Sequence, residues 1–190
     1  MKKPVERCRW TNLKNPLYID YHDNEWGVPL HDDGKLFELF ILETFQAGLS
    51  WECVLNKREA FRRAFDGFDI QKISNWNDEK ISALMSNKNI IRNRLKIKAA
   101  VQNSRAFTAL QKEYGSFDNF IWSFTDGKTV YEEYNSQTTS PLSDEISRIL
   151  KRRGFSFAGS TTVYSFLQAC GVINGHGKEC FKFIDNPNKE

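Results

Sequence analysis

The stretch 36–51 constrains the fold of this chain more than any other. Hydrophobic side chains recur in it at the three- and four-residue spacing of one helix face, which predicts a helix over 36–48 with a buried side. Glu43 lies on that same face, three residues after Phe40 and four before Ala47. Burying an unpaired carboxylate is costly, so a stable fold rarely places one on a core-facing stripe without a use.

A ligand pocket would explain this carboxylate. Gln46 lies one turn further along the predicted helix, Trp51 follows just beyond it, and residues 47–50 have the pattern of a helix end and a tight loop. A negative group, an amide and a large aromatic ring at one place suit a planar, hydrogen-bonding ligand. The alternative is that Glu43 faces water or pairs with one of the 27 Lys and Arg residues.

Basic residues are concentrated in one segment. Between Lys80 and Lys112 there are eight Lys or Arg residues and no Asp or Glu, whereas the rest of the chain has 19 basic and 24 acidic residues. Such an uneven distribution is typical of a protein that binds a polyanion. A solvated basic helix face without a partner is the alternative.

The composition indicates a folded cytoplasmic protein. Hydrophobic residues make up 40% and charged residues 27%, and no apolar run approaches the roughly 18 residues of a membrane span. The first residues lack the apolar segment of a secretory signal, so we expect the four cysteines to be thiols or metal ligands. Nothing in the sequence calls for a membrane partner or for more than a monomer.

Helical periodicity dominates the chain and predicts an all-α fold. Beyond the first helix, we expect helices over about 57–66, 78–86, 94–113, 116–124, 141–152 and 160–170. No stretch alternates convincingly as a strand.

The connection 87–94 between two of these helices has the pattern of a phosphate-binding hairpin. Ile90 and Ile91 are flanked by polar residues, so their side chains would dock into the helices while the backbone N–H groups point outward. The N-terminus of the next helix would favour a phosphate. Basic side chains nearby are Arg92, Arg94 and Lys96. This helix-hairpin-helix interpretation implies contact with the DNA backbone; an ordinary helix–helix turn is the alternative.

Two cysteines and two histidines near the chain ends form a candidate metal site. Cys8 and His22 lie near the start, whereas His176 and Cys180 lie near the end at a spacing that one helical turn would bring to the same point. Two thiolates and two imidazoles complete a tetrahedral Zn²⁺ site with no position left for water. The predicted role is therefore structural, a clip between the termini, which argues against metal-assisted hydrolysis.

Seven ordered motifs run through the chain and together resemble one family. They are the segments 8–10, 18–29, 42–51, 90–94, 120–124, 153–157 and 164–171. This set is similar to the signature of the DNA-3-methyladenine glycosylase I family and extends over roughly residues 7 to 181. The resemblance implies a two-lobed helix-hairpin-helix glycosylase fold in one unit, 1–190, with a central lobe at about 55–125 and a second lobe from the terminal segments.

The resemblance also implies roles for single residues. Glu43 corresponds to the pocket carboxylate that contacts the excised base. The other implied substrate contacts are Trp10, Tyr18, Tyr21, Gln46 and Trp51, of which Trp10, Tyr21 and Trp51 would form aromatic walls. Gly48 and Leu49 match the loop that enters the duplex where the flipped nucleotide leaves. The resemblance assigns one structural zinc to Cys8, His22, His176 and Cys180. Asn89 and Leu95 stand where some relatives carry glycine, which leaves the phosphate contact of the hairpin open.

The implied reaction is base excision from double-stranded alkylated DNA. Methylation at N3 gives adenine a positive charge and weakens its bond to the sugar, so the leaving group is already activated. The enzyme would flip the nucleotide out of the stack and hold the cationic purine against aromatic rings. Glu43, if ionised, would accept hydrogen bonds from the amino edge of the purine while water attacks the sugar carbon. We expect monofunctional hydrolysis that releases free 3-methyladenine; whether Glu43 also positions the water stays open.

Two other classes of function stay open on the sequence alone. A zinc-clipped helical module would recognise damaged or bent duplex without cutting the glycosidic bond, although such a binder has no need of a negative pocket. A structural helical protein would use the basic segment to bind another protein. Release of free base from methylated DNA, and salt-sensitive DNA affinity, distinguish the three.

Overall fold

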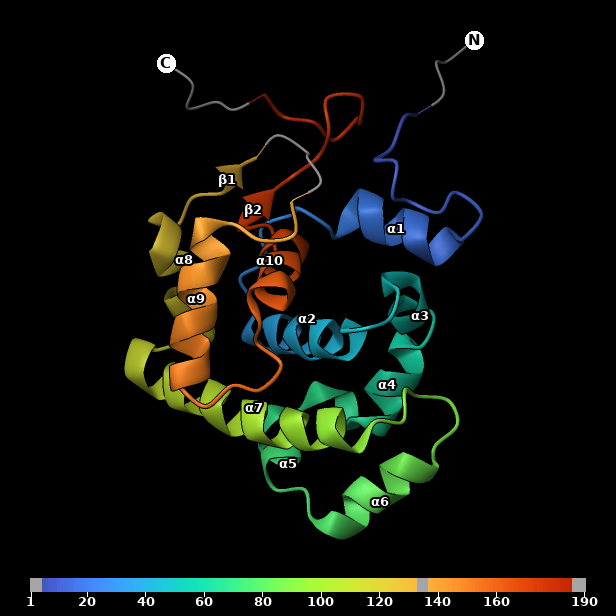
Figure 1. The fold of residues 1–190 in the computed structure, drawn as a ribbon, viewed down its shortest axis with the longest axis vertical. Coiled ribbons are helices and arrows are strands. Elements are labelled where there is room, and N and C mark those ends of the chain that lie inside the picture. The colour runs from blue at the N-terminus through green and yellow to red at the C-terminus, as the bar shows by residue number, and fades with distance from the viewer. Residues whose placement is uncertain (1–4, 133–136, 186–190) are drawn as a thin grey trace.

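The structure is a computed structural model that describes residues 5–132 and 137–185, and helices account for most of it (Figure 1). In chain order the elements are α1 (Pro16–Asn24), α2 (Asp33–Gln46), α3 (Trp51–Leu55), α4 (Arg58–Ala64), the 3₁₀ helix η1 (Asp66–Phe68), α5 (Ile70–Ser74), α6 (Asp78–Ser86), α7 (Arg94–Tyr114), α8 (Phe117–Trp122), the 3₁₀ helix η2 (Ser123–Thr125), β1 (Val130–Tyr131), α9 (Pro141–Arg152), α10 (Ser160–Ala169) and β2 (Ile173–Asn174). The predicted helical class is confirmed. The short strands β1 and β2 pair in parallel, and the sequence pattern did not predict them.

Local sequence sets where the helices begin. Asp32, Asn93 and Ser140 precede α2, α7 and α9, and each side chain accepts a hydrogen bond from a backbone N–H of the first turn. All seven predicted helices are present, with ends within three residues of the expected ones. The helices α1, α3 and α5 were not predicted, because they are nine, five and five residues long and too short for a clear period. An Asn15 cap followed by Pro16 was the available signal for α1.

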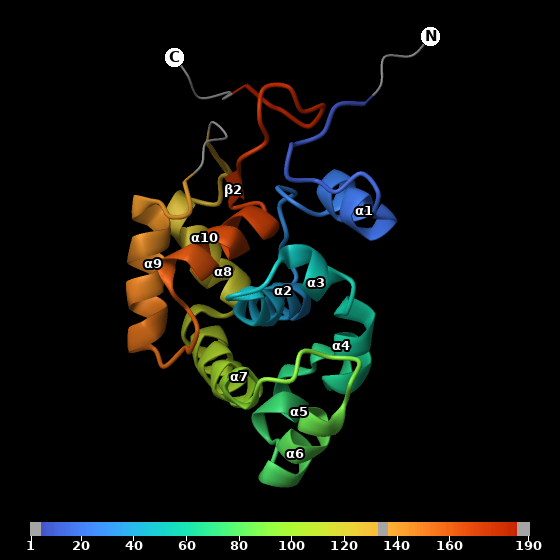
Figure 2. The same ribbon diagram turned by 45° about the vertical axis from the view of Figure 1, so that its right-hand side comes forward.

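The helix α2 lies at the centre of the molecule (Figure 2). Ten consecutive residues, 36–45, are buried, so α2 is covered on all sides rather than on the one face that the sequence predicts. Phe37 packs edge-on against Phe107 of α7 at 5.2 Å between ring centroids, and Phe40 packs against Phe166 of α10 at 5.4 Å. These large rings fix the position of α2, and with it the position of Glu43.

The two ends of the described chain come together at one end of the molecule, and α4, α5 and α6 lie at the other (Figure 1). The backbone N–H of Phe181 donates to the carbonyl of Glu6 at 2.9 Å. The division into a central lobe at about 55–125 and a second lobe from the terminal segments stays a prediction. No described helix is long and apolar enough to cross a membrane.

Segment 27–30 is fastened to the end of α10, which fixes α1 against the core. Gly27 N–H donates to the Gln168 carbonyl at 2.9 Å, and Leu30 N–H donates to the Cys170 carbonyl at 3.0 Å. Gly171 has a φ of +76°, and a Cβ there would meet backbone atoms of Val28 at 2.3 Å. Only glycine fits this approach.

Gly171→Ala therefore destabilises the protein, by about 3 kcal/mol, because backbone strain adds to a clash with backbone atoms. Gly67→Ala is the matched control: its φ is +70°, but nothing lies within 4 Å of the added Cβ, so the cost is about 1 kcal/mol. Urea unfolding of both variants measures the difference. Equal losses in the two variants would contradict the close approach of segment 27–30 to α10.

Candidate active site and metal centre

A cavity of about 320 Å³ lies beside α2, and every residue that the sequence predicts for the base pocket lines it. Its lining consists of Trp10, Tyr18, Tyr21, Trp26, Glu43, Gln46, Trp51, Gln137, Thr138, Ser165 and Gln168. The structure thus brings together side chains from the N-terminal segment, α1, α2, α3 and α10. Their contact with a substrate stays a prediction.

Aromatic rings make up one side of this cavity. Tyr21 and Trp51 are buried, with ring centroids 5.0 Å apart and planes inclined by 45°. Trp10 packs edge-on against Tyr18 at 5.6 Å and against Trp26 at 4.8 Å. Such rings present flat, electron-rich faces that bind planar cations well.

Among the described residues that line the cavity, Glu43 is the only acidic one. Its side chain projects from the middle of α2 and the residue is only 3% exposed. Among the described residues, its Oε2 atom has no hydrogen-bond partner. Burial raises the pKa of the Glu43 carboxyl to about 8, because water no longer stabilises the charged form. The Glu43 carboxyl of the ligand-free protein is therefore mostly protonated at pH 7, whereas the role expected from the sequence requires the ionised form.

Trp51 supplies a complementary donor in the same cavity. Its indole Nε1 is buried and also lacks a hydrogen-bond partner among the described residues. Buried polar atoms without partners are rare in folded proteins, and two of them beside one cavity suit a ligand that has both donors and acceptors.

Five residues that line the cavity were not predicted as pocket residues: Trp26, Gln137, Thr138, Ser165 and Gln168. Trp26 lies within a motif of the family resemblance, so that motif was a usable signal. Ser165 and Gln168 lie on α10, far from α2 in the sequence, and only the packing of α10 on α2 brings them to the cavity. Both lie within the motif 164–171 of the family resemblance, which was the one sequence signal for them.

The predicted loop after α2 is present. α2 ends at Gln46, Gly48 has a φ of +81°, and the Ser50 side chain accepts a hydrogen bond from Cys53 N–H to start α3. Leu49 is 43% exposed. Gln46 and Trp51 on either side of this loop both line the cavity, so the loop lies at the cavity's edge.

The hairpin 87–93 joins α6 to α7 as predicted, with Ile90 buried against the core. Arg92 and Arg94 are exposed. One expected feature differs, since the N–H of Asn89 donates to the side-chain oxygen of Asn87 at 3.0 Å instead of facing outward.

Lys96, expected on the DNA-facing surface, is instead 5% exposed. Its ammonium donates to the carbonyl oxygens of Phe45 at 2.9 Å and Ala47 at 2.5 Å, at the C-terminal end of α2. The periodicity of α7 did not reveal this because the partner atoms belong to the backbone of a different helix.

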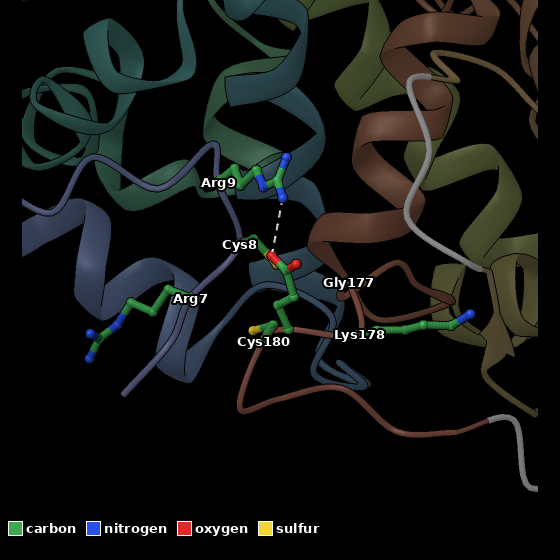
Figure 3. A pocket seen from close by; sticks show the side chains of 7 residues that line it. Arg7, Cys8, Arg9, Gly177, Lys178 and Cys180 are labelled. Carbon is green, nitrogen blue, oxygen red and sulfur yellow. Dashed lines mark hydrogen bonds and ion pairs between the residues drawn. The ribbon is translucent and has the colours of Figure 1, made fainter. Parts of the chain in front are cut away.

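The predicted metal ligands converge. One donor atom from each of Cys8, His22, His176 and Cys180 lies within 4.8 Å of the others, and all four residues are buried. Figure 3 shows Cys8 and Cys180 coming from the two terminal segments of the chain. Sγ of Cys180 lies 3.4 Å from both Nε2 of His22 and Nδ1 of His176. Neighbouring ligands of a tetrahedral Zn²⁺ ion lie roughly 3.5 Å apart, so the donor set fits such an ion.

The other ring nitrogen of each histidine also has a partner. Nδ1 of His22 lies 2.7 Å from Asp23 Oδ1, and Asp23 is in turn held by Arg7. Nε2 of His176 lies 3.2 Å from the carbonyl of Trp26. Such outer contacts fix the orientation of metal-binding imidazoles.

The expected helical turn between His176 and Cys180 is wrong. The backbone there forms a turn in which Cys180 N–H donates to Gly177 at 2.8 Å. The two side chains still meet, because the turn brings them as close as a helix would.

Comparison with known proteins shows the family of this chain. Residues 10–183 match the Methyladenine glycosylase family. DNA-3-methyladenine glycosylase 1 of Escherichia coli strain K12 is 44% identical over 186 residues, covering 96% of this chain and 99% of that protein. DNA-3-methyladenine glycosylase of Haemophilus influenzae is 43% identical, covering 92% and 96%.

Solved structures are similar over the same length. A crystal structure of 3-methyladenine DNA glycosylase I superimposes with a TM-score of 0.90 at 46% identity, covering 94% of this chain and all of that one. The 3-methyladenine DNA glycosylase I of Staphylococcus aureus, solved to explain its recognition of 3-methyladenine, has a TM-score of 0.86 at 38% identity, covering 91% and 95%. On this agreement of sequence and fold along nearly its whole length, the chain belongs to the methyladenine glycosylase family.

Proposed function

We propose that this protein hydrolyses the N-glycosidic bond of 3-methyladenine in alkylated double-stranded DNA. It releases the free base and leaves an abasic site, without a lyase step. The observation that carries this proposal is the buried Glu43 carboxyl, whose Oε2 lacks a partner among the described residues, inside an aromatic cavity. The relatives named above, and a related glycosylase solved in complex with 3-methyladenine, support the choice of base.

The chemistry places modest demands on the protein. The methylated base is already cationic, so when the glycosidic bond breaks the base takes the bonding electrons and departs neutral. The positive charge passes to the sugar, which water captures with loss of a proton. The cavity's task is to select the flipped cationic base over neutral adenine, and aromatic faces with one carboxylate suit that task.

Glu43 binds a cation best when it is ionised. Arrival of a positive charge lowers the pKa of a buried carboxyl, so cation binding expels the proton that Glu43 holds in the empty cavity. A neutral base offers no such compensation and leaves the carboxyl protonated. This coupling discriminates between methylated and ordinary adenine without a steric difference.

Duplex binding is proposed for two elements. Arg92 and Arg94 beside the hairpin 87–93 would contact phosphates, and Leu49 would fill the space that the flipped nucleotide vacates. The proposal is supported by the exposure of all three side chains. We infer that a monomer suffices and that the enzyme acts in the cytoplasm, where bacterial DNA is found.

The cluster of Cys8, His22, His176 and Cys180 is proposed to hold one structural Zn²⁺ ion. When bound, the ion would join the two terminal segments and supply no reactive water, because all four positions are taken by protein. The residues around it keep Trp10 and Trp26 in place, since Trp10 packs on His22 at 5.2 Å and Trp26 on His176 at 4.6 Å.

Glu43→Gln should lower base release from methylated duplex DNA by roughly 100-fold, because an amide cannot balance the positive charge. Non-specific duplex affinity should not change. Single-turnover release of 3-methyladenine and a salt titration of DNA binding measure the two effects. Full activity in the variant would remove Glu43 from the site; tight binding by the parent protein without base release would favour a pure binding module.

The pH dependence follows from the raised pKa of Glu43. The ionised fraction of Glu43 in the free protein increases as pH rises through about 8, so kcat/KM for base release should increase from pH 6 through 8 and level off only about one pH unit higher. The residual activity of Glu43→Gln should lack this rise. A kcat/KM that is constant or falls over this range would contradict the assignment.

Cys180→Ser should lower bound zinc well below about one ion per chain and reduce the melting temperature, because the terminal clip loses a ligand. Cys53→Ser is the control, since Cys53 is half-buried and lies outside the cluster. Metal analysis and thermal melts compare the two. The same zinc content and melting temperature in both variants would argue against the metal site.

A further inference from the structure

The ammonium of Lys96 lies where four segments of the chain meet. Its hydrogen bonds reach the last residue but one of α2, Phe45, and the first loop residue after α2, Ala47. The same nitrogen lies 5.9 Å from the ring centroid of Phe157, in the connection between α9 and α10. Lys96 itself belongs to the first turn of α7, directly after the hairpin.

These contacts satisfy groups that α2 leaves without partners. The last carbonyls of any helix lack partners within that helix and carry the negative end of its dipole, so a cation is favourable there. The last turn of α2 contains no basic residue of its own, and Lys96 supplies one from α7. Burial lowers the pKa of the Lys96 ammonium, because the charged form is less stable away from water. Burying this charge costs free energy, which a purely local role does not justify.

The position of the loop 47–50 depends on few contacts. Ala47 accepts from Lys96, Leu49 N–H donates to the Gln46 carbonyl at 2.6 Å, and Ser50 starts α3. Between these points, Gly48 faces open space: a Cβ there would have no neighbour within 4 Å. Lys96 therefore holds the loop at its first residue.

We propose that Lys96 is a positioning residue that couples the hairpin to Leu49 during base flipping. This inference rests on the proposed function, in which the hairpin contacts phosphates and Leu49 enters the duplex. One side chain from the start of α7 fixes the distance between the two elements. Leu49 then contacts the base stack of the duplex at a fixed distance from the phosphates that the hairpin binds.

The consequence is specific to DNA. Free 3-methyladenine needs only the cavity residues, whereas a base within a duplex must first be extruded. Loss of the Lys96 ammonium should therefore reduce extrusion and leave the affinity for the free base unchanged. Small errors in the placement of groups that act together cause large losses in rate.

The test uses the full-length protein and Lys96→Met, which keeps the length of the side chain but removes its charge and donors. We expect single-turnover base release from methylated duplex to fall roughly 10- to 100-fold. The fluorescence of 2-aminopurine beside the lesion should show slower or less complete flipping. The affinity for free 3-methyladenine should stay within about twofold. Lys151→Met, an exposed lysine on α9, controls for loss of one positive charge.

A double-mutant cycle with Leu49→Ala separates positioning from simple loss of stability. If Lys96 acts through Leu49, the double variant should be no slower than Leu49→Ala alone. Additive losses, or Lys96→Met behaving like Lys151→Met, would overturn the coupling. If Lys96→Met does not fold, Lys96→Gln, which keeps a donor at shorter reach, enters the same cycle.

The outcomes also separate this inference from the proposed function. A normal rate for Leu49→Ala would overturn both the insertion of Leu49 and the coupling, while leaving Glu43 and its cavity untouched. A slow Leu49→Ala with a normal Lys96→Met would overturn the coupling alone. Absence of base release by the parent protein would overturn the proposed glycosylase activity itself.

Discussion

The candidate site depends on the burial of Glu43, which projects from the middle of α2. Because α2 is covered on every side, it can hold a carboxyl away from water. Large rings such as Phe37 and Phe40 pack against neighbouring helices and keep α2 from shifting toward solvent. The fold thereby maintains a group whose charged form is unfavourable until a cation arrives. The buried carboxyl lowers the stability of the protein but serves in recognition, as is common for groups at functional sites.

The cluster of Cys8, His22, His176 and Cys180 contacts residues that also line the cavity. The carbonyl of Trp26 lies against His176, and the ring of Trp26 lines the cavity. Gly171 also packs closely against segment 27–30, which directly follows Trp26 in the chain. The terminal segments therefore build one wall of the pocket as well as closing the molecule, so an ion at the Cys and His cluster would act on base recognition through packing.

Part of the candidate site could be predicted from local signals in the sequence, whereas Trp10, Tyr18 and Tyr21 were expected from the family resemblance alone. Glu43 was conspicuous on an apolar stripe, and the cysteines and histidines formed a complete ligand set. The remainder depended on tertiary packing. Ser165 and Gln168 reach the cavity only because α10 packs on α2, and the basic pattern that contains Lys96 does not distinguish a solvated lysine from one that binds the carbonyls of another helix. The buried Glu38 illustrates the same limit, since its partners Arg58 and Arg62 lie on a later helix.

The most direct test of the account is the pKa of Glu43 itself, followed through the ¹³C chemical shift of its carboxyl carbon. In the ligand-free protein we expect a titration near pH 8, far above the usual value for a glutamate. A cationic N-methylated purine should move that midpoint to lower pH, whereas adenine should leave it in place. A midpoint near 4.5 in the free protein, or one that the cation does not shift, would contradict the claim that a buried carboxyl selects the charged base.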